Sequence, residues 1–172
     1  MNLRNITLDH LILADDLEYP NNPRFALILY LGVLAGQERF DPGRYESLFE
    51  SNAWYASWRD GVYPYHHYHS TAHEALGIYC GSAVILFGGE YGTAKSVQAG
   101  DVVVIPAGVS HKRLTCSSDF AVVGGYPTGQ KPDIQYGRPG ERPRTDRTIS
   151  RLQVPKTDPV YGADGPLLQL WK

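Results

Sequence analysis

Residues 61–81 read GVYPYHHYHSTAHEALGIYCG, and residues 100–111 read GDVVVIPAGVSH. Together they contain three histidines and one acid whose side chains suit a single metal ion: His67, His69, Glu74 and His111. Imidazole nitrogen and carboxylate oxygen are common ligands of first-row divalent metals. The two segments therefore predict a metal site built from separate parts of the chain.

Strand geometry explains how the first segment can bring its donors together. Successive side chains of a strand alternate between faces, so His67 and His69 point the same way, about 7 Å apart. An unbroken strand would give His73 the same face and would turn Glu74 away. The small polar stretch Ser70–Ala72 is a place where the chain can turn and reset this alternation.

The residues after this turn favour Glu74 over His73 as the inward-facing group. The row of Glu74 is otherwise apolar, as the interior of a barrel requires: Leu76, Ile78 and Cys80. A carboxylate on such a row is costly unless it is paired or coordinated. We therefore expect Glu74 to face the metal and His73 to face outward or toward a loop. His111 opens a new strand after the tight Pro106–Gly108 turn, and can reach the same ion from the opposite sheet.

Length and composition are those of an ordinary globular domain. The chain has 172 residues, 42% hydrophobic and 20% charged, with a formal net charge of -2. No block of like charge stands out, which argues against a nucleic-acid or anionic-membrane partner. No apolar run approaches the roughly 20 residues of a membrane helix, and Met1–Asp16 lacks the apolar centre of a signal peptide. We therefore expect a cytoplasmic protein.

Short apolar stretches separated by Gly, Pro, Asn and Asp fill most of the chain, which is typical of an all-β sandwich or barrel. One segment differs, because Asp41 followed by Pro42 is a helix start. Aromatic residues then recur near helical spacing, so a helix is predicted over Pro42–Ser57. The segments predicted as strands are Leu8–Ala14, Phe25–Leu34, Val62–Tyr68, Glu74–Cys80, Ala83–Phe87, Asp101–Ile105, His111–Cys116 and Phe120–Tyr126.

The composition changes after Tyr126. Gly129–Arg144 is rich in Gly, Pro, Arg and Asp, and indicates a surface excursion rather than a second domain. Thr148–Val154 and Leu167–Trp171 are expected either to add short strands or to pack as an arm. One domain over residues 1–172 is predicted, with N-terminal strands and a helix in 1–59, a core barrel in about 60–127, and a C-terminal arm in 128–172.

The histidine pattern resembles the two conserved motifs of the cupin superfamily. Together with Pro20–Pro23, Trp58–Gly61, Tyr65–Glu74 and Asp158–Gly162, it makes the wider chain similar to a narrower group, the YjlB-like bacterial cupins. The resemblance implies an all-β fold with a single cupin barrel, of the double-stranded β-helix or jelly-roll type, one short helix in its N-terminal half and an irregular C-terminal extension. It also implies one divalent transition metal, Fe, Mn, Ni or Zn, held by the four donors. The motif positions are Gly61, His67, His69, Glu74 and Gly81, then Gly100, Pro106, Gly108 and His111.

Four further side chains are candidates for the pocket beyond the metal. Alternation from His111 places Arg113 inward, where a guanidinium would suit a substrate carboxylate or phosphate. A bulge would instead leave it in solvent or in an ion pair. Tyr63 and Tyr65 share the inward parity of the first two histidines, and Tyr126 ends the last core strand. Any of these phenols could donate a hydrogen bond at the pocket mouth, with core packing as the alternative role.

These features favour a metal-dependent enzyme that acts on a small organic molecule, for which an anionic group would suit Arg113. The resemblance implies a range of activities that includes dioxygenases, decarboxylases and isomerases. Two alternatives stay open: a non-catalytic, metal-stabilised small-molecule binding or sensor domain, and a metal-free barrel whose histidines are structural. The edges of Leu8–Ala14 and Phe25–Leu34 could exchange between subunits, so a homodimer is predicted.

Overall fold

The computed structural model describes residues 6–34, 36 and 39–172. The predicted domain of residues 1–172 also contains residues 1–5, 35, 37 and 38, which lie outside the described part. The described elements, in chain order, are β1 (Thr7–Leu13), β2 (Asn22–Leu31), α1 (Gly43–Ser51), β3 (Trp54–Asp60), β4 (Glu74–Cys80), β5 (Ser82–Phe87), β6 (Thr93–Gln98), β7 (Val102–Ile105), β8 (His111–Cys116), β9 (Ala121–Pro127), α2 (Arg144–Arg151) and α3 (Leu167–Leu170).

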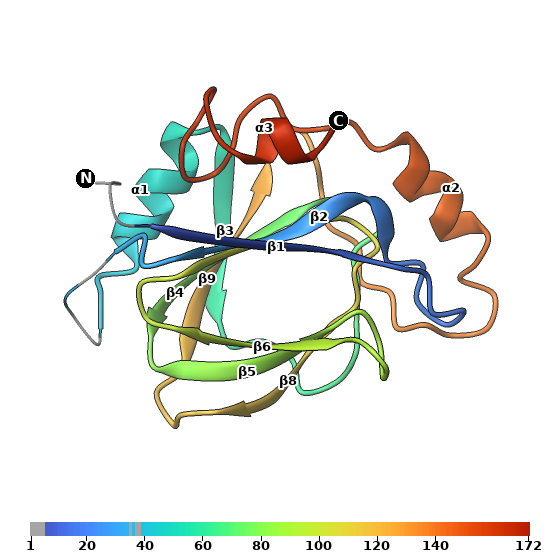
Figure 1. The fold of residues 1–172 in the computed structure, drawn as a ribbon, viewed down its shortest axis with the longest axis horizontal. Helices are drawn as coiled ribbons and strands as arrows, with labels where there is room; N and C mark the ends of the chain where they lie inside the picture. The colour runs from blue at the N-terminus through green and yellow to red at the C-terminus, as the bar shows by residue number, and fades with distance from the viewer. Residues whose placement is uncertain (1–5, 35, 37–38) are drawn as a thin grey trace.

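The strands form two antiparallel sheets (Figure 1). The six-stranded sheet has the order β1-β2-β7-β4-β9-β3, and the three-stranded sheet has the order β6-β5-β8. His67 extends the smaller sheet through an isolated bridge to His111, the first residue of β8. From β3 onward the chain passes repeatedly from one sheet to the other, which is the path of a double-sheet jelly roll. The all-β jelly roll predicted from the sequence is confirmed.

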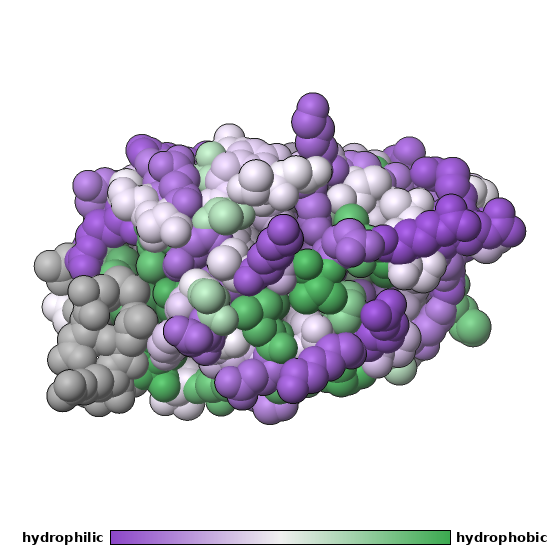
Figure 2. All heavy atoms as spheres, turned by 90° about the horizontal axis from the view of Figure 1, so that it is seen from above, coloured by the Kyte–Doolittle hydropathy of each residue, from purple (hydrophilic) through white to green (hydrophobic). Residues whose placement is uncertain are grey.

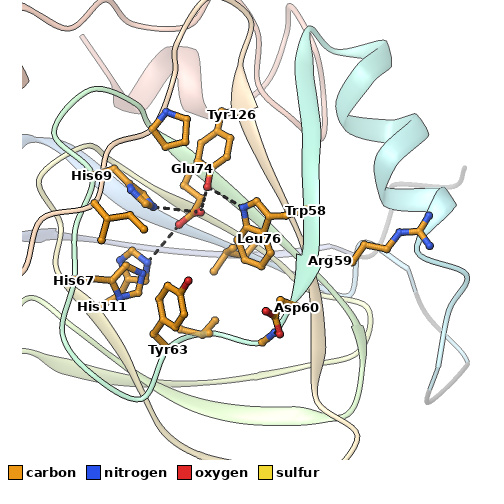
Figure 3. A pocket seen from close by; sticks show the side chains of 14 residues that line it. Trp58, Arg59, Asp60, Tyr63, His67, His69, Glu74, Leu76, His111 and Tyr126 are labelled. Atoms are coloured by element: carbon orange, nitrogen blue, oxygen red, sulfur yellow. Dashed lines mark hydrogen bonds and ion pairs between the residues drawn. The ribbon is translucent and has the colours of Figure 1, made fainter.

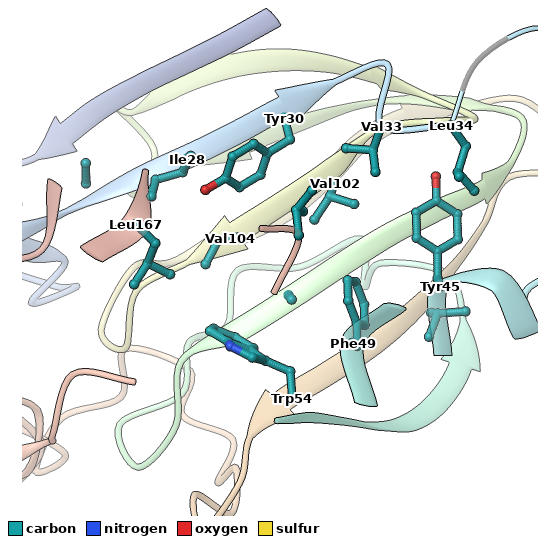
Figure 4. Close-up of a cluster of buried hydrophobic side chains, with 14 of the residues drawn as sticks. Ile28, Tyr30, Val33, Leu34, Tyr45, Phe49, Trp54, Val102, Val104 and Leu167 are labelled. Carbon is teal, nitrogen blue, oxygen red and sulfur yellow. The ribbon is translucent and has the colours of Figure 1, made fainter. Parts of the chain in front are cut away.

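The core has two layers, because the larger sheet is buried on both faces. In β2, Leu27 and Leu29 belong to the cluster between the sheets, whereas Ile28 and Tyr30 belong to a cluster on the outer face. This alternation follows from the two-residue period of a strand. Helix α1 and the C-terminal arm cover the outer cluster (Figure 4). The side chains that this cover contributes are Tyr45, Phe49, Val160, Leu167 and Trp171.

A buried carboxylate attaches the C-terminal arm to the outer face. Asp158 accepts three backbone N–H bonds of 2.7–3.1 Å from its own segment, and it also accepts the hydroxyl of Tyr30 on β2. The indole of Trp171 donates to the carbonyl of Ala26 at 2.9 Å. The arm therefore packs against the sheet, and its regular segments are the helices α2 and α3 rather than short strands.

The predicted helix over Pro42–Ser57 is too long. The helix starts one residue later than expected, at Gly43 with Pro42 as its N-cap, and Asp41 Oδ1 accepts the N–H of Gly43 at 3.0 Å. It ends at Ser51, and the next aromatic residues lie on β3, which pairs with β9. A register shift between Ala56 and Trp58 separates the aromatic side chains. Trp54 enters the outer cluster, whereas Trp58 packs against the inner one.

Two further strand predictions are corrected. The segment predicted as a strand over Val62–Tyr68 forms only isolated bridges at His67 and Tyr68. Strand β6 is missing from the prediction, because its sequence TAKSVQ buries only one residue, Val97.

Among the described residues, none of the helices has the length and apolarity that crossing a bilayer requires. Figure 2 shows mainly hydrophilic side chains on the upper face, with smaller hydrophobic areas between them.

Candidate metal centre

Three imidazoles from two segments meet inside the jelly roll (Figure 3). The ligand nitrogens of His67, His69 and His111 all lie within 4.8 Å of one another, and all three residues are buried. Backbone hydrogen bonds hold the segments together, and two of them join His67 and His111. The N–H of His67 donates to the His111 carbonyl at 3.3 Å, and the N–H of His111 donates to the His67 carbonyl at 2.9 Å. This bridge fixes the spacing of the imidazoles across the smaller sheet.

Each of these imidazoles has one nitrogen directed at a backbone carbonyl. Nδ1 of His67 lies 3.2 Å from the Tyr65 carbonyl, Nδ1 of His111 lies 3.1 Å from the Val109 carbonyl, and Nδ1 of His69 contacts the carbonyl of Asp133. A carbonyl only accepts hydrogen bonds, so the proton of a neutral imidazole belongs on Nδ1 and the lone pair on Nε2. In each of the three histidines, Nε2 is therefore the nitrogen with a lone pair that could bind a metal.

The chain turns between His69 and Glu74, at the place where the sequence predicts a change of alternation. The carboxylate of Asp133 accepts the N–H of Ser70 at 2.6 Å and that of Thr71 at 3.2 Å, which holds the turn. Strand β4 then begins at Glu74. After this turn, Glu74 faces the imidazoles.

The carboxylate of Glu74 completes the cluster. Oε1 lies 3.4 Å from Nε2 of His69, and Oε2 lies 3.3 Å from Nε2 of His111. The Tyr126 hydroxyl donates to Oε1 at 2.9 Å, and the indole of Trp58 donates to that hydroxyl at 2.8 Å. Glu74 is only 2% exposed, so these polar contacts offset the cost of burying it.

The pKa shifts in the cluster follow from burial and from neighbouring charge. Burial lowers the pKa of His67 to about 3, and His111 adds to this effect. Burial also acts to lower the pKa of His69, but the adjacent Glu74 carboxylate outweighs it and raises that pKa. Burial acts to raise the pKa of Glu74, but His69 and His111 hold it well below its usual range. An ionised acid among imidazoles with directed lone pairs is a donor set that fits a divalent ion.

The donors line a cavity of about 290 Å³. Its charged residues besides Glu74 are Arg59 and Asp60. The Arg59 guanidinium donates two hydrogen bonds to the carboxylate of Glu46 on α1, at 2.6 and 2.8 Å, and Figure 3 shows it directed away from the cavity. The remaining walls are mainly aromatic or aliphatic and comprise Trp58, Gly61, Val62, Tyr63, Leu76, Tyr126, Pro132 and Ile134.

The predicted pocket residues lie in different places. Tyr63 and Tyr126 line the cavity, whereas Tyr65 stacks on Tyr63 with ring centroids 4.9 Å apart. Arg113 does not line it, which corrects the expected contact between this side chain and a substrate. Arg113 shares the strand face of His111, but its Nε donates to the Val62 carbonyl at 3.0 Å, so the backbone holds the guanidinium elsewhere.

His73 directly precedes β4 and points away from the cluster, as expected, and it is buried. Its ring packs against Phe25 and Trp171 in the outer cluster, and its Nδ1 accepts the N–H of Ala107 at 3.0 Å. Burial lowers the pKa of His73 to about 3, so the ring is neutral. Its position beneath the C-terminal arm gives it a packing role.

Two residues of the site are missing from the sequence prediction. Trp58 falls just beyond the predicted helix, among the aromatic residues that suggested it, which hides its place on the cavity wall. Asp133 lies in the Gly- and Pro-rich segment after β9, and no spacing signal connects it with His69. The spacing within WYASWRD would put Trp58 on the face of Trp54, and only the register shift opposite β9 turns it to the cavity side.

Comparisons with known proteins identify the family. No protein-family model matches the chain. The uncharacterized protein YjlB of Bacillus subtilis (strain 168) is 44% identical over 157 residues, which cover 91% of this chain and 92% of that protein. The chain belongs to the YjlB family. This YjlB-family chain is also similar to two solved structures at much lower identity.

One of these structures is the DMSP lyase DddQ from Ruegeria pomeroyi DSS-3, with 18% identity and a TM-score of 0.38. The match covers 78% of the YjlB-family chain and 53% of the DddQ chain. The other is RmlC from Streptococcus suis in complex with dTDP-D-xylose, with 13% identity and a TM-score of 0.39, covering 96% and 94% of the two chains.

Proposed function

We propose that His67, His69, Glu74 and His111 hold one divalent transition-metal ion, Fe, Mn, Ni or Zn, and that the chain is a metal-dependent enzyme acting on a small organic molecule. The observation that carries the proposal is the common orientation of the three imidazoles, each with Nδ1 at a carbonyl, together with the Glu74 carboxylate 3.3–3.4 Å from Nε2 of His69 and His111. Bound there, such an ion would supply Lewis-acid or redox chemistry.

The chain's own residues support this role in two ways. Tyr126 and Trp58 form a hydrogen-bonded chain that holds the Glu74 carboxylate in one orientation. Partners of this kind commonly tune a metal site. The cavity walls beyond the donors are mainly apolar, and the volume of about 290 Å³ is close to the lower limit of ligand cavities, which are about 300–1,000 Å³. A small molecule is therefore the fitting substrate.

Metal content tests the first half of the proposal. Protein purified without added metal is analysed for transition metals, and chelated protein is titrated with Zn²⁺. We expect about one equivalent per chain, and we expect His69→Ala to lose it while keeping the native circular dichroism spectrum. His10→Ala is the matched control, since His10 is exposed on β1. Less than about a tenth of an equivalent in both experiments would refute the site.

Access of solvent to the bound ion tests the proposed enzymatic role, because a catalytic metal site keeps an open coordination position and a purely structural one does not. Protein loaded with Mn²⁺ is examined by water-proton relaxation. An enhanced relaxation rate that falls when a small chelating ligand is added would support an enzyme. A bound Mn²⁺ with no exchanging water would instead indicate a closed, structural centre.

A further inference from the structure

The cavity walls beyond the metal donors indicate which class of molecule fits there. We propose that the substrate has an uncharged planar ring at its far end, held between Trp58 and Tyr63, and directs its donor atom toward Glu74 and the histidines. This inference rests on the proposed function, because it assigns a substrate class to the same site. Three observations support it: a rigid indole, an exposed aromatic mouth, and the position of every charge around the cavity.

Trp58 is held as a rigid wall. A Cβ atom added to Gly124 would overlap the indole, so the ring of Trp58 lies directly against the backbone of β9. Its Nε1 is bound to the Tyr126 hydroxyl at 2.8 Å. With its backbone side and its polar edge both occupied, the indole offers apolar ring surface to the cavity. Flat aromatic surfaces of this kind favour planar partners.

Tyr63 stands at the mouth of the same cavity and is 43% exposed. Its ring stacks on Tyr65, with centroids 4.9 Å apart and planes 13° apart, and meets the edge of His67 at 5.1 Å. Figure 3 shows its hydroxyl directed toward the space in front of Glu74. Tyr65 and Ile134 beside it are also exposed. Exposed apolar clusters of this kind commonly mark ligand-binding sites.

The charges around the cavity disfavour an anionic group at the far end of the substrate. Among the described residues that line it, the cation is Arg59, whose guanidinium is bound by Glu46. Arg113 is held by the Val62 carbonyl. The mouth instead carries the exposed carboxylate of Asp60. A distal anion would therefore meet a like charge without a compensating cation.

Three matched chelators test the proposal on Zn²⁺-loaded protein, with dissociation constants measured by calorimetry. Acetohydroxamate carries only the chelating group, benzohydroxamate adds a neutral ring, and 4-carboxybenzohydroxamate adds a distal anion. We expect benzohydroxamate to bind at least about tenfold more tightly than acetohydroxamate. We expect the distal carboxylate to cancel most of this gain. Equal binding of the first two, or tighter binding of the carboxylated ring, would overturn the inference.

Substitutions in the cavity wall test where the aromatic ring of benzohydroxamate binds. Tyr63→Leu and Trp58→Leu are each expected to reduce the preference for the ring severalfold, with Zn²⁺ stoichiometry measured in every sample. Tyr63→Leu is the cleaner variant, since Trp58 also supports Tyr126. Tyr91→Leu is the matched control, because Tyr91 is 98% exposed and does not line the cavity. An unchanged preference in both site variants would place the ring elsewhere and refute the proposal.

The two proposals fail separately. If Zn²⁺ binds and the hydroxamates show no ring preference, only the substrate class is wrong. If Zn²⁺ does not bind, the proposed function is wrong, and benzamide is then tested on the metal-free protein by saturation-transfer NMR. Contact between benzamide and the protein that is lost in Tyr63→Leu would support the proposed ring-binding site. The absence of such contact would refute it.

Discussion

Each histidine of the centre has a carbonyl partner for one nitrogen and the common cluster for the other. Two of these carbonyls, from Tyr65 and Val109, lie two residues before the histidine that they hold. The local backbone therefore sets two tautomers, and only His69 depends on a distant loop. Such an arrangement reduces the reorganisation that metal binding requires.

Tyr126 is the residue that orients the acid. Tyr126→Phe keeps the ring but removes the donor to Glu74 and the acceptor for Trp58. We predict that Zn²⁺ affinity falls about tenfold or more, since loss of such a supporting bond typically has that effect. Tyr55→Phe on the neighbouring strand β3 is the control, because its hydroxyl donates to the Gln130 carbonyl. Equal Zn²⁺ affinity in both variants would show that the Tyr126 hydroxyl does not support the site.

Gly124 makes room for the indole of Trp58. We predict that Gly124→Ala lowers the free energy of unfolding by about 1–3 kcal/mol, because the added methyl displaces the ring. Tryptophan fluorescence should shift as well. Gly61→Ala is the matched change, since an added Cβ there meets nothing within 4 Å. Urea unfolding of the two variants measures the difference. Similar midpoints would mean that the indole can move aside without lowering the free energy of unfolding.

The sequence predicts the inward direction of Glu74 because the row it starts is apolar. The same reasoning places Arg113 on the correct strand face, but the side chain does not line the cavity. Alternation gives the direction in which a side chain leaves the backbone. It cannot show that a long guanidinium will bend back to the Val62 carbonyl. The end of a flexible side chain depends on neighbours that are distant in sequence.

At the scale of elements, the segment 130–137 connects the cavity mouth to the turn between His69 and Glu74. Pro132 and Ile134 line the cavity, and Asp133 between them binds both the turn at Ser70 and the ring of His69. The segment therefore covers the site and positions one of its ligands. Its composition predicts an irregular surface segment, but the contacts of Asp133 come from tertiary structure alone.

Asp133→Ala tests this connection. We predict that the Ser70 and Thr71 amides exchange hydrogen at least about tenfold faster, because each loses its carboxylate acceptor. Zn²⁺ affinity should fall as the turn loosens. Lys131→Ala is the control, since this exposed residue of the same segment contributes only its backbone carbonyl, to Thr71. Unchanged exchange at Ser70 and Thr71 would contradict the role of Asp133.

The element predictions succeed where strands are strongly apolar or begin at a motif, as in β4 and β8. They fail at β3 and β6 for different reasons. The aromatic residues around Trp54 and Trp58 fit helical spacing, and pairing with β9 decides otherwise. Strand β6 is polar on its exposed face, and its pairing with β5 makes it a strand. In both cases the partner strand overrides the local pattern.

For the whole molecule, the C-terminal arm closes the outer core. We predict that Asp158→Ala lowers the free energy of unfolding by about 3 kcal/mol, because several buried donors lose their charged acceptor. Asp164→Ala on the same arm is the control, since Asp164 is exposed. Thermal unfolding of both variants gives the comparison. Equal midpoints would mean that the arm is held mainly by its apolar contacts.

The single domain over residues 1–172, the homodimer and the cytoplasmic location all stay predictions. Strand β1 lies at the edge of the larger sheet, with Leu8 and Ile12 exposed. An exposed edge of this kind is available for pairing with a second copy.

The central claim is that four side chains from two separate segments bind one ion. Crystals of Zn²⁺-loaded protein, measured at the zinc absorption edge, test it most directly. We predict one anomalous peak per chain, about 2.0–2.2 Å from Nε2 of each of the three histidines and from a Glu74 oxygen. A zinc peak away from these atoms, or none at full Zn²⁺ saturation, would contradict the claim.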